Sequence, residues 1–326
     1  MFKVFVDGQH GTTGLEIHRL LAGRTELELL EVAPADKKDS QVRRALLNEA
    51  DAVVLCLPDD AAIKAVRLIE SPDVRVLDAS TAHRTDATWA YGLPELPTQR
   101  QRLAGAKRVS NPGCYPTGFV LAVRPLIDAG LLPATVPLSV HAVSGYSGGG
   151  RQMIEKFEAR ASTAASPDEL FHAQAYGLTM KHKHVPEMQR YAGTAAAPLF
   201  TPSVGHFHRG MLVCVPLFVA SLARPTTRDD VRNLWNDAYT GEACVVVLPH
   251  DAALDGGYLD PQGANHGNQV ELMVFGNAEQ LLLVARLDNL GKGAAGAAVQ
   301  NLNLMLGLPE LAGVPKRPAA ASEQPA

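Results

Sequence analysis

The sequence has few cysteines, and none of them form a cluster. Four occur in 326 residues, at positions 56, 114, 214 and 244, and no two make a CxxC pair. Neither a disulfide framework nor a zinc cluster is therefore expected. No apolar run reaches the roughly 18 residues that a membrane span needs. The chain opens on the strand-like segment 2–6 with no basic region before it, so we expect a cytoplasmic protein without a membrane partner.

The sequence also lacks a strong excess of either charge. Thirty basic residues against 34 acidic ones give a formal net charge of −4, and no basic face indicates binding to a phosphate backbone. We therefore expect no nucleic-acid partner. With 46% hydrophobic and 20% charged residues, the composition is that of an ordinary globular protein. The length suggests two domains, each with its own core.

The first part of the chain alternates short apolar runs with stretches of helical periodicity. Strands are expected over residues 3–7, 27–32, 52–57 and 74–78, and helices over 14–22, 40–48 and 61–69. Strands separated by helices imply right-handed crossovers and a parallel sheet with helices on both faces. The expected fold class is therefore α/β, with a doubly wound, Rossmann-type nucleotide domain.

From about Thr135 the pattern changes to longer strands with fewer helices between them. Strands are expected over residues 136–143, 210–220, 243–248, 269–277 and 280–287, followed by one helix over about 293–306. A mixed, mainly antiparallel sheet in an α+β domain accounts for this pattern. The last residues, 316–326, have the composition of a disordered tail.

A glycine-rich loop follows the first expected strand. Gly8, Gly11 and Gly14 have a GxxGxxG spacing and lie between that strand and the first helix. Such a loop cradles a dinucleotide pyrophosphate on the backbone N–H groups at the helix start, with the Thr12 and Thr13 hydroxyls nearby. A tight turn would need the same glycines, but we favour cofactor binding. Glu31 could bind the ribose 2′-hydroxyl and would favour NAD, whereas Lys37 or Lys38 could bind the 2′-phosphate and would favour NADP. These residues therefore leave the choice of nucleotide open.

One cysteine differs from the other three. Cys114 lies in Asn-Pro-Gly-Cys-Tyr-Pro-Thr, directly before an apolar-periodic helix. The N-terminus of a helix stabilises a thiolate, so we expect a depressed pKa, and its N–H groups could also hold an oxyanion. A buried free cysteine is the simpler alternative. The flanking Asn, Pro and Gly argue against it.

Two further segments carry candidate site residues. His182 and His184 precede Glu187, so an acid/base imidazole oriented by the carboxylate is possible. A metal site would need further ligands, and a solvated basic stretch is the third alternative. The segment 144–150 is a second glycine-rich loop that could bind an anion together with Arg151, although a flexible hinge would look the same.

Nearly the whole chain resembles one enzyme family. The motifs that carry the resemblance are the first glycine loop, Asp-Ala-Ser-Thr-Ala-His-Arg ending at Arg84, Asn-Pro-Gly-Cys-Tyr-Pro-Thr around Cys114, the second glycine loop, the His182–Glu187 segment, and Asp-Asn-Leu-Gly-Lys-Gly-Ala-Ala from Asp288. Together they resemble the shorter N-acetyl-γ-glutamyl-phosphate reductases of the semialdehyde dehydrogenase superfamily. The motif around Cys114 is the most specific.

The resemblance implies an arginine-biosynthesis enzyme that reduces an acyl phosphate with NADPH through a Cys114 thioester. It assigns acid/base or orienting work to His182, His184 and Glu187. It also implies a nucleotide domain of residues 1–114 and about 290–326, and a catalytic and dimerisation domain of residues 115–289. The expected cofactor-binding residues are Gly8, His10, Gly11, Thr12, Thr13, Gly14, Ser80, Gly148 and Asn289. The expected substrate-binding residues are Arg84, Asn111, Ser144, Gly145 and Arg151. No metal is expected.

Other functions remain possible at this stage. Aspartate-semialdehyde dehydrogenase and aminoadipyl-phosphate reductase use the same chemistry, the latter on a substrate that is either free or carrier-linked. A non-catalytic NADP-binding regulator would keep the fold without turnover, and a zinc hydrolase fits the residues less well. The apolar strands of the second domain predict a homodimer or homotetramer.

Overall fold

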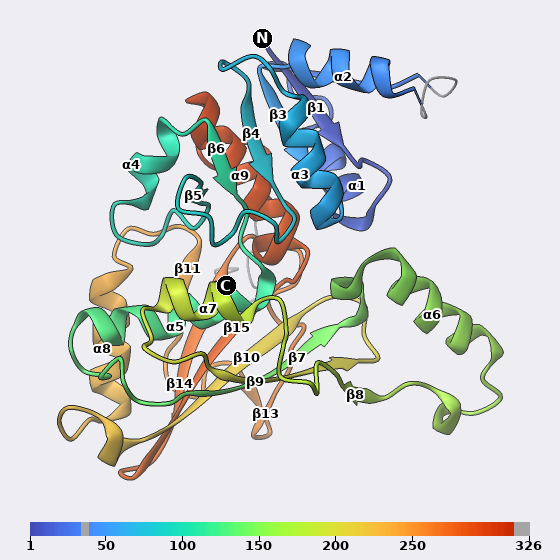
Figure 1. The fold of residues 1–326 in the computed structure, drawn as a ribbon. Coiled ribbons are helices and arrows are strands. Elements are labelled where there is room, and N and C mark those ends of the chain that lie inside the picture. Colours follow the sequence, from blue (N-terminus) through green and yellow to red (C-terminus); the bar gives the residue numbers. More distant parts are fainter. Residues whose placement is uncertain (34–38, 316–326) are drawn as a thin grey trace, which may run out of the picture.

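A computed structural model describes residues 1–33 and 39–315 and places them around two separate β-sheets (Figure 1). Lys37, Lys38 and the predicted tail 316–326 lie outside the described residues. Within the described ranges, every helix is too short or too polar to cross a membrane.

The first sheet is entirely parallel, with strand order β2-β1-β3-β4-β6-β5. Its strands are β1 (Phe2–Asp7), β2 (Leu27–Leu30), β3 (Ala52–Leu55), β4 (Arg75–Asp78), β5 (Ala90–Tyr91) and β6 (Arg108–Ser110). The helices of this region are α1 (Thr12–Leu21), α2 (Ser40–Glu49), α3 (Asp59–Leu68) and α4 (Gln99–Ala104). The order reverses at β1, as expected for a doubly wound sheet.

The first sheet buries apolar side chains on both faces, because helices cover both. Val4 and Val6 belong to a core shared with α1 and with α9 (Gly296–Leu306). Phe5 and Val53 point to the other face, into a core shared with α2 and α3. The predicted doubly wound α/β fold is thus confirmed. The last helix packs on the first sheet although almost 200 residues separate it from β6 (Figure 1).

The second sheet is mixed, with strand order β11-β14-β15-β10-β7-β9-β8. Its strands are β7 (Ser139–Gly145), β8 (Ala173–Ala175), β9 (Leu199–Gly205), β10 (Met211–Phe218), β11 (Val245–Val247), β14 (Val270–Gly276) and β15 (Gln280–Leu287), and a separate hairpin pairs β12 (Leu254–Asp255) with β13 (Tyr258–Leu259). The pairs β7/β9 and β11/β14 are parallel and the others antiparallel, as predicted.

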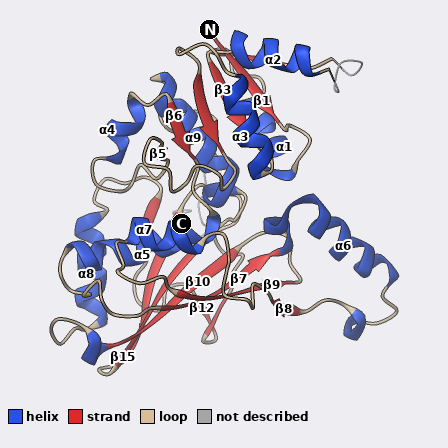
Figure 2. Cartoon of the chain, viewed as in Figure 1, coloured by secondary structure: helices blue, strands red, loops and turns tan. Residues whose placement is uncertain are grey.

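Three helices pack on one face of the second sheet: α5 (Cys114–Asp128), α7 (Val185–Ala192) and α8 (Arg228–Ala238). Figure 2 shows α5 and α7 between the two sheets and α8 at the side of the second sheet, whereas α6 (Gly150–Thr163) extends away from the rest of the chain. The second face of this sheet carries more exposed side chains, among them His141, Leu199 and Phe218.

Several predicted elements need correction. Helices α6, α7 and α8 and strands β5, β6 and β9 were not predicted. The strand expected from residue 136 begins at Ser139, after Pro137, which has no N–H to donate to a sheet. The helix expected from about residue 293 begins with a π-helical turn at Gly291–Ala295 and continues as α9.

Candidate active site

A cavity of about 390 Å³ lies between the two sheets, where β4 and β6 end and α5 begins. It brings together segments that are far apart in the sequence, including the second glycine loop, the histidine pair and the π-helical turn. The predicted site residues that line it are Thr13, Arg84, Asn111, Cys114, Ser144, Gly145, Gly148, His182, His184 and Asn289.

Cys114 is the first residue of α5, as predicted, and its N-cap residue Gly113 offers no side-chain cap. The expectation of a depressed thiol pKa was wrong. Burial raises the pKa of Cys114 to about 11, although the positive charge of Arg84 and the backbone N–H groups of Tyr115 and Cys114 act in the opposite direction. The thiol is therefore protonated at neutral pH and needs a base before it can react.

A buried carboxylate holds the loop that carries the cysteine. Glu187 accepts hydrogen bonds from the Gly113 N–H at 2.8 Å, the Tyr91 hydroxyl at 2.9 Å and Arg84 Nη1 at 3.1 Å. Arg84 also donates from Nε to the Asn111 carbonyl at 2.9 Å. Glu187 does not line the cavity, so it acts as a positioning residue. It also occupies the Gly113 N–H, which is then unavailable to an oxyanion.

The two histidines lie next to each other at the start of α7. Their ring centroids are 4.8 Å apart, and the His184 backbone N–H donates to His182 Nδ1 at 3.1 Å. Burial lowers the pKa of His182 to about 4 and, together with the Arg84 charge, lowers the pKa of His184 well below its usual value. Both rings are therefore neutral at pH 7 and can accept a proton.

The His184 ring lies against the Cys114 loop, although about 70 residues separate the two in the sequence. A Cβ atom placed on Gly113 would lie 2.7 Å from His184 Nε2 and 2.6 Å from Arg84 Nη1. His184 Nδ1 is buried and has no hydrogen-bond partner in the described part of the chain. Across residues 1–33 and 39–315, no three His, Cys, Asp or Glu side chains are arranged to hold a metal ion.

The first glycine loop fits a dinucleotide. A Cβ on Gly8, at φ +91°, would lie 2.3 Å from the Cys56 carbonyl oxygen, and a Cβ on Gly14 would lie 2.3 Å from the Gly8 carbonyl oxygen. Only glycine therefore allows this close turn. No side chain caps the N-terminus of α1, which leaves its first N–H groups available to an anion, and Thr13 lines the cavity.

Glu31, the acidic residue that would favour NAD, extends beyond the end of β2 and forms an ion pair with His18 at 3.2 Å. His10 is exposed in the loop, while Gly11 and Thr12 are half-buried at the start of α1. Ser80 is another predicted cofactor residue that does not line the cavity. Its hydroxyl donates to Asp78 Oδ2 at 2.8 Å.

The second glycine loop borders the cavity, but Arg151 does not. Arg151 is 72% exposed on α6 and pairs with Glu155 at 2.6 Å. Asn289 fixes the loop by donating to Ser147 Oγ at 2.9 Å and accepting from the Gly210 N–H at 2.9 Å. Its amide therefore supports the cavity wall.

Sequence reasoning missed Tyr176. Its hydroxyl donates to the Tyr115 hydroxyl at 2.9 Å, and both tyrosines line the cavity beside Cys114. Burial raises the pKa of Tyr176 to about 12, so the pair stays protonated and can donate hydrogen bonds. Tyr115 could have been found from its place in the cysteine motif. Tyr176 follows a short strand and has no comparable signal.

Two family descriptions match the chain. The semialdehyde dehydrogenase NAD binding domain matches residues 3–105, and the semialdehyde dehydrogenase dimerisation domain matches residues 114–289. Among curated proteins, N-acetyl-gamma-glutamyl-phosphate reductase 2 of Nostoc sp. is 49% identical over 318 residues, covering 96% of this chain and 99% of that protein. The protein of the same name from Pseudomonas putida is 49% identical over 307 residues, covering 93% and 96%.

Among solved structures, aspartate semialdehyde dehydrogenase II from Vibrio cholerae, complexed with ASA, superposes with a TM-score of 0.71. It shares 16% sequence identity, and the match covers 94% of this chain and 98% of that chain. At this identity the likeness shows a common fold.

Proposed function

The chain belongs to the N-acetyl-γ-glutamyl-phosphate reductases of the semialdehyde dehydrogenase family, and from this premise we propose its reaction and the roles of its residues. It reduces N-acetyl-L-glutamyl 5-phosphate to N-acetyl-L-glutamate 5-semialdehyde and inorganic phosphate, a step of arginine biosynthesis in the cytoplasm. One observation carries the proposal: Cys114 begins a buried helix at a cavity that also holds Arg84 and two neutral imidazoles.

Cys114 is the nucleophile. Its Sγ forms a bond to the acyl carbon, the bond from that carbon to the phosphate oxygen breaks, and a thioester and phosphate result. The backbone N–H groups of Cys114 and Tyr115 and the Arg84 guanidinium stabilise the negative charge of the thiolate. Arg84, Asn111, Ser144 and Gly145 lie at the cavity wall, where they hold the anionic substrate.

His184 is the acid/base residue, since its Nε2 approaches the Gly113–Cys114 loop. As a neutral ring it accepts the proton of the Cys114 thiol and returns it to the departing phosphate. An acyl phosphate brings negative charge into the cavity, which favours the protonated imidazole during the step. His182 orients its neighbour, because its Nδ1 accepts the His184 backbone N–H.

The loop from Gly8 to Gly14, including Thr13, would hold the cofactor together with Gly148 and the loop that Asn289 supports. A reduced nicotinamide bound there would supply a hydride to the acyl carbon. The oxyanion on that carbon would then become the aldehyde carbonyl as the C–S bond breaks, and Cys114 would leave as the thiolate. We infer NADP as the cofactor from the family resemblance.

The assay that tests this function runs the reaction backwards. The purified protein is given N-acetylglutamate semialdehyde, phosphate and either NADP or NAD, and the absorbance of the reduced nicotinamide is followed. We expect phosphate-dependent reduction of NADP. The proposed substrate would be wrong if the protein bound NADP and reduced it with aspartate or aminoadipate semialdehyde but not with N-acetylglutamate semialdehyde. A lack of NADP reduction with all three semialdehydes would favour the non-catalytic regulator.

The functional unit is a homodimer or homotetramer built on the second sheet. The described chain leaves Leu199 and Phe218 of that sheet more than half exposed, and a dimerisation-domain family matches this region. Apolar side chains on an open sheet face favour a symmetric contact between copies. Sedimentation velocity on the wild-type protein and on Phe218→Glu tests this, since the charge should shift the equilibrium toward the monomer.

A further inference from the structure

A fully buried ion pair lies close to the cavity but outside it. Lys292 Nζ donates to Glu95 Oε1 at 2.6 Å, and both side chains are 0% exposed. Gln300 completes the cluster, because its Oε1 accepts from Lys292 Nζ at 2.7 Å and its Nε2 donates to Glu95 Oε1 at 2.9 Å. None of these three residues lines the cavity or takes part in the steps above.

Lys292 belongs to the π-helical turn Gly291–Ala295, and the next residue of that turn, Gly293, lies against Cys114. A Cβ placed on Gly293 would lie 2.8 Å from Cys114 Cβ, so the bare backbone of this turn packs against the cysteine. The same turn accepts a hydrogen bond at the Ala294 carbonyl from Asn111 Nδ2 at 3.1 Å. The same turn therefore contacts the ion pair through the Lys292 side chain and the Cys114 loop through the backbone of Gly293 and Ala294.

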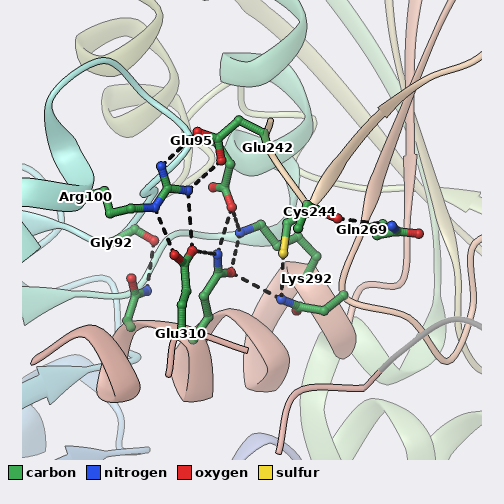
Figure 3. A network of polar contacts seen from close by, with 12 residues as sticks. Gly92, Glu95, Arg100, Glu242, Cys244, Gln269, Lys292 and Glu310 are labelled. Atoms are coloured by element: carbon green, nitrogen blue, oxygen red, sulfur yellow. Dashed lines mark hydrogen bonds and ion pairs between the residues drawn. The ribbon is translucent and has the colours of Figure 1, made fainter. Parts of the chain in front are cut away.

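The cluster continues into a network that joins the two halves of the fold (Figure 3). Gln300 Nε2 also donates to Glu310 Oε1 at 2.8 Å, and Glu310 pairs with Arg100 at 2.9 Å. Arg100 in turn donates to both oxygens of Glu242, which follows α8 over the second sheet. The network thus anchors the π turn to both regions that enclose the cavity.

A buried pair of this kind is poorly explained by stability alone. Apolar residues of similar volume often serve as well or better at such a place, because burying charges costs desolvation energy. The second carboxylate oxygen, Glu95 Oε2, has no hydrogen-bond partner in the described chain, which adds to that cost. π-helical turns are also rare and occur frequently at functional sites.

We propose that Lys292 is a positioning residue for catalysis: its ion pair with Glu95 holds the π turn so that Gly293 packs against Cys114 and fixes the nucleophile. The proposal rests on Cys114 being the nucleophile of the proposed reaction. Loss of the pair releases the turn, which gives solvent and small reagents more access to the thiol while the geometry of attack on the substrate deteriorates.

Two variants and one control test this. Lys292→Met keeps the side-chain length without the ammonium group, and Lys292→Met with Glu95→Gln removes both buried charges, so that no unpaired carboxylate opposes folding. Arg100→Met is the matched control, because it breaks the more exposed end of the network, where Arg100 pairs with Glu242 and Glu310 rather than with Lys292. For each protein, kcat, KM, the thermal midpoint and the rate of Cys114 alkylation by iodoacetamide are measured, the last by peptide mass spectrometry.

We expect kcat to fall about 100-fold in both Lys292 variants, since small misplacements of reacting groups cost this much, with KM within about 3-fold. Alkylation of Cys114 should become faster in both, and the double variant should melt closer to the wild type than the single one. Arg100→Met should melt lower, with kcat and alkylation within about 2-fold of the wild type.

A folded double variant with wild-type kcat and a wild-type alkylation rate would overturn the proposal. The proposal would also be overturned if Arg100→Met lost as much turnover, and gained as much in alkylation rate, as the Lys292 variants. The effect would then be one of general stability. If the wild-type protein lacked the reductase activity, the proposed function would fail, whereas the alkylation comparison would still decide whether Lys292 positions Cys114.

Discussion

Two helices of this protein begin in nearly the same way. The N-cap of α1 is Gly11, with φ −79° and ψ 162°, and the N-cap of α5 is Gly113, with φ −74° and ψ 153°. Each helix follows a strand of the parallel sheet, and neither has a side-chain cap. By local structure alone, both are anion sites.

The surroundings make the two helix starts different. The start of α1 is half-exposed, so its N–H groups remain accessible to an incoming pyrophosphate. The start of α5 lies under α7 and the π-helical turn, so Glu187 occupies one of its N–H groups and burial raises the pKa of the cysteine thiol. The comparison teaches that one backbone motif leaves its N–H groups accessible where it is open and changes the pKa of its first side chain where it is enclosed, which fits the binding and covalent roles proposed above.

Removing the thiol should have the largest effect. Cys114→Ser should lower turnover by at least about 1000-fold, because a serine hydroxyl ionises far less readily than a thiol and no thioester can form. Binding of NADP, followed by fluorescence titration, should be unchanged because the α1 loop is untouched. Turnover near the wild-type level would rule out the thioester mechanism.

Adding one methyl group to each loop should separate the two functions. Gly14→Ala places a Cβ against the Gly8 carbonyl, so NADP affinity should fall about 10-fold or more while alkylation of Cys114 stays the same. Gly113→Ala presses on Arg84 and His184, so kcat should fall about 100-fold with NADP affinity retained. Thermal melts of both variants control for folding. Equal loss of both properties in each variant would mean that the loops do not act separately.

The pH dependence of Cys114 should reflect its enclosure. Because burial raises the thiol pKa to about 11, the thiolate fraction is small at pH 7 and grows as the pH rises. The rate of alkylation by iodoacetamide in the free protein should therefore keep rising about 10-fold per pH unit from pH 7 to pH 9. A plateau near neutral pH would instead indicate a helix-stabilised thiolate.

The smallest effect is expected outside the cavity. Arg151→Ala removes an exposed guanidinium whose partner is Glu155 on the same helix, so kcat and KM should stay within about 2-fold. Arg84→Ala, compared in the same assay, should lower kcat/KM by a far larger factor because it removes a buried charge beside Cys114. A large loss in Arg151→Ala would show that the second glycine loop carries an anion clamp when substrate binds.

Features that depend on neighbouring residues were predictable from the sequence. The glycine loop follows from three glycines after an apolar run, and the place of Cys114 at a helix start follows from Pro-Gly before an apolar-periodic segment. The same logic failed for β9, where Pro202 argues against a strand, and for α6, where Phe157 is the one residue classed as buried. It also gave Arg151 a role that its orientation on α6 does not support.

The sequence by itself determined the doubly wound sheet, the glycine loop and the place of Cys114 at the start of a helix, because each is encoded by local periodicity and turn chemistry. Only the tertiary structure decided that Glu187 positions the cysteine loop, that Tyr176 reaches Tyr115, and that Lys292 lies behind Gly293. It also decided the direction of the thiol pKa. The physical reason is that desolvation and ion pairing depend on groups brought together from distant parts of the chain, which no local pattern encodes.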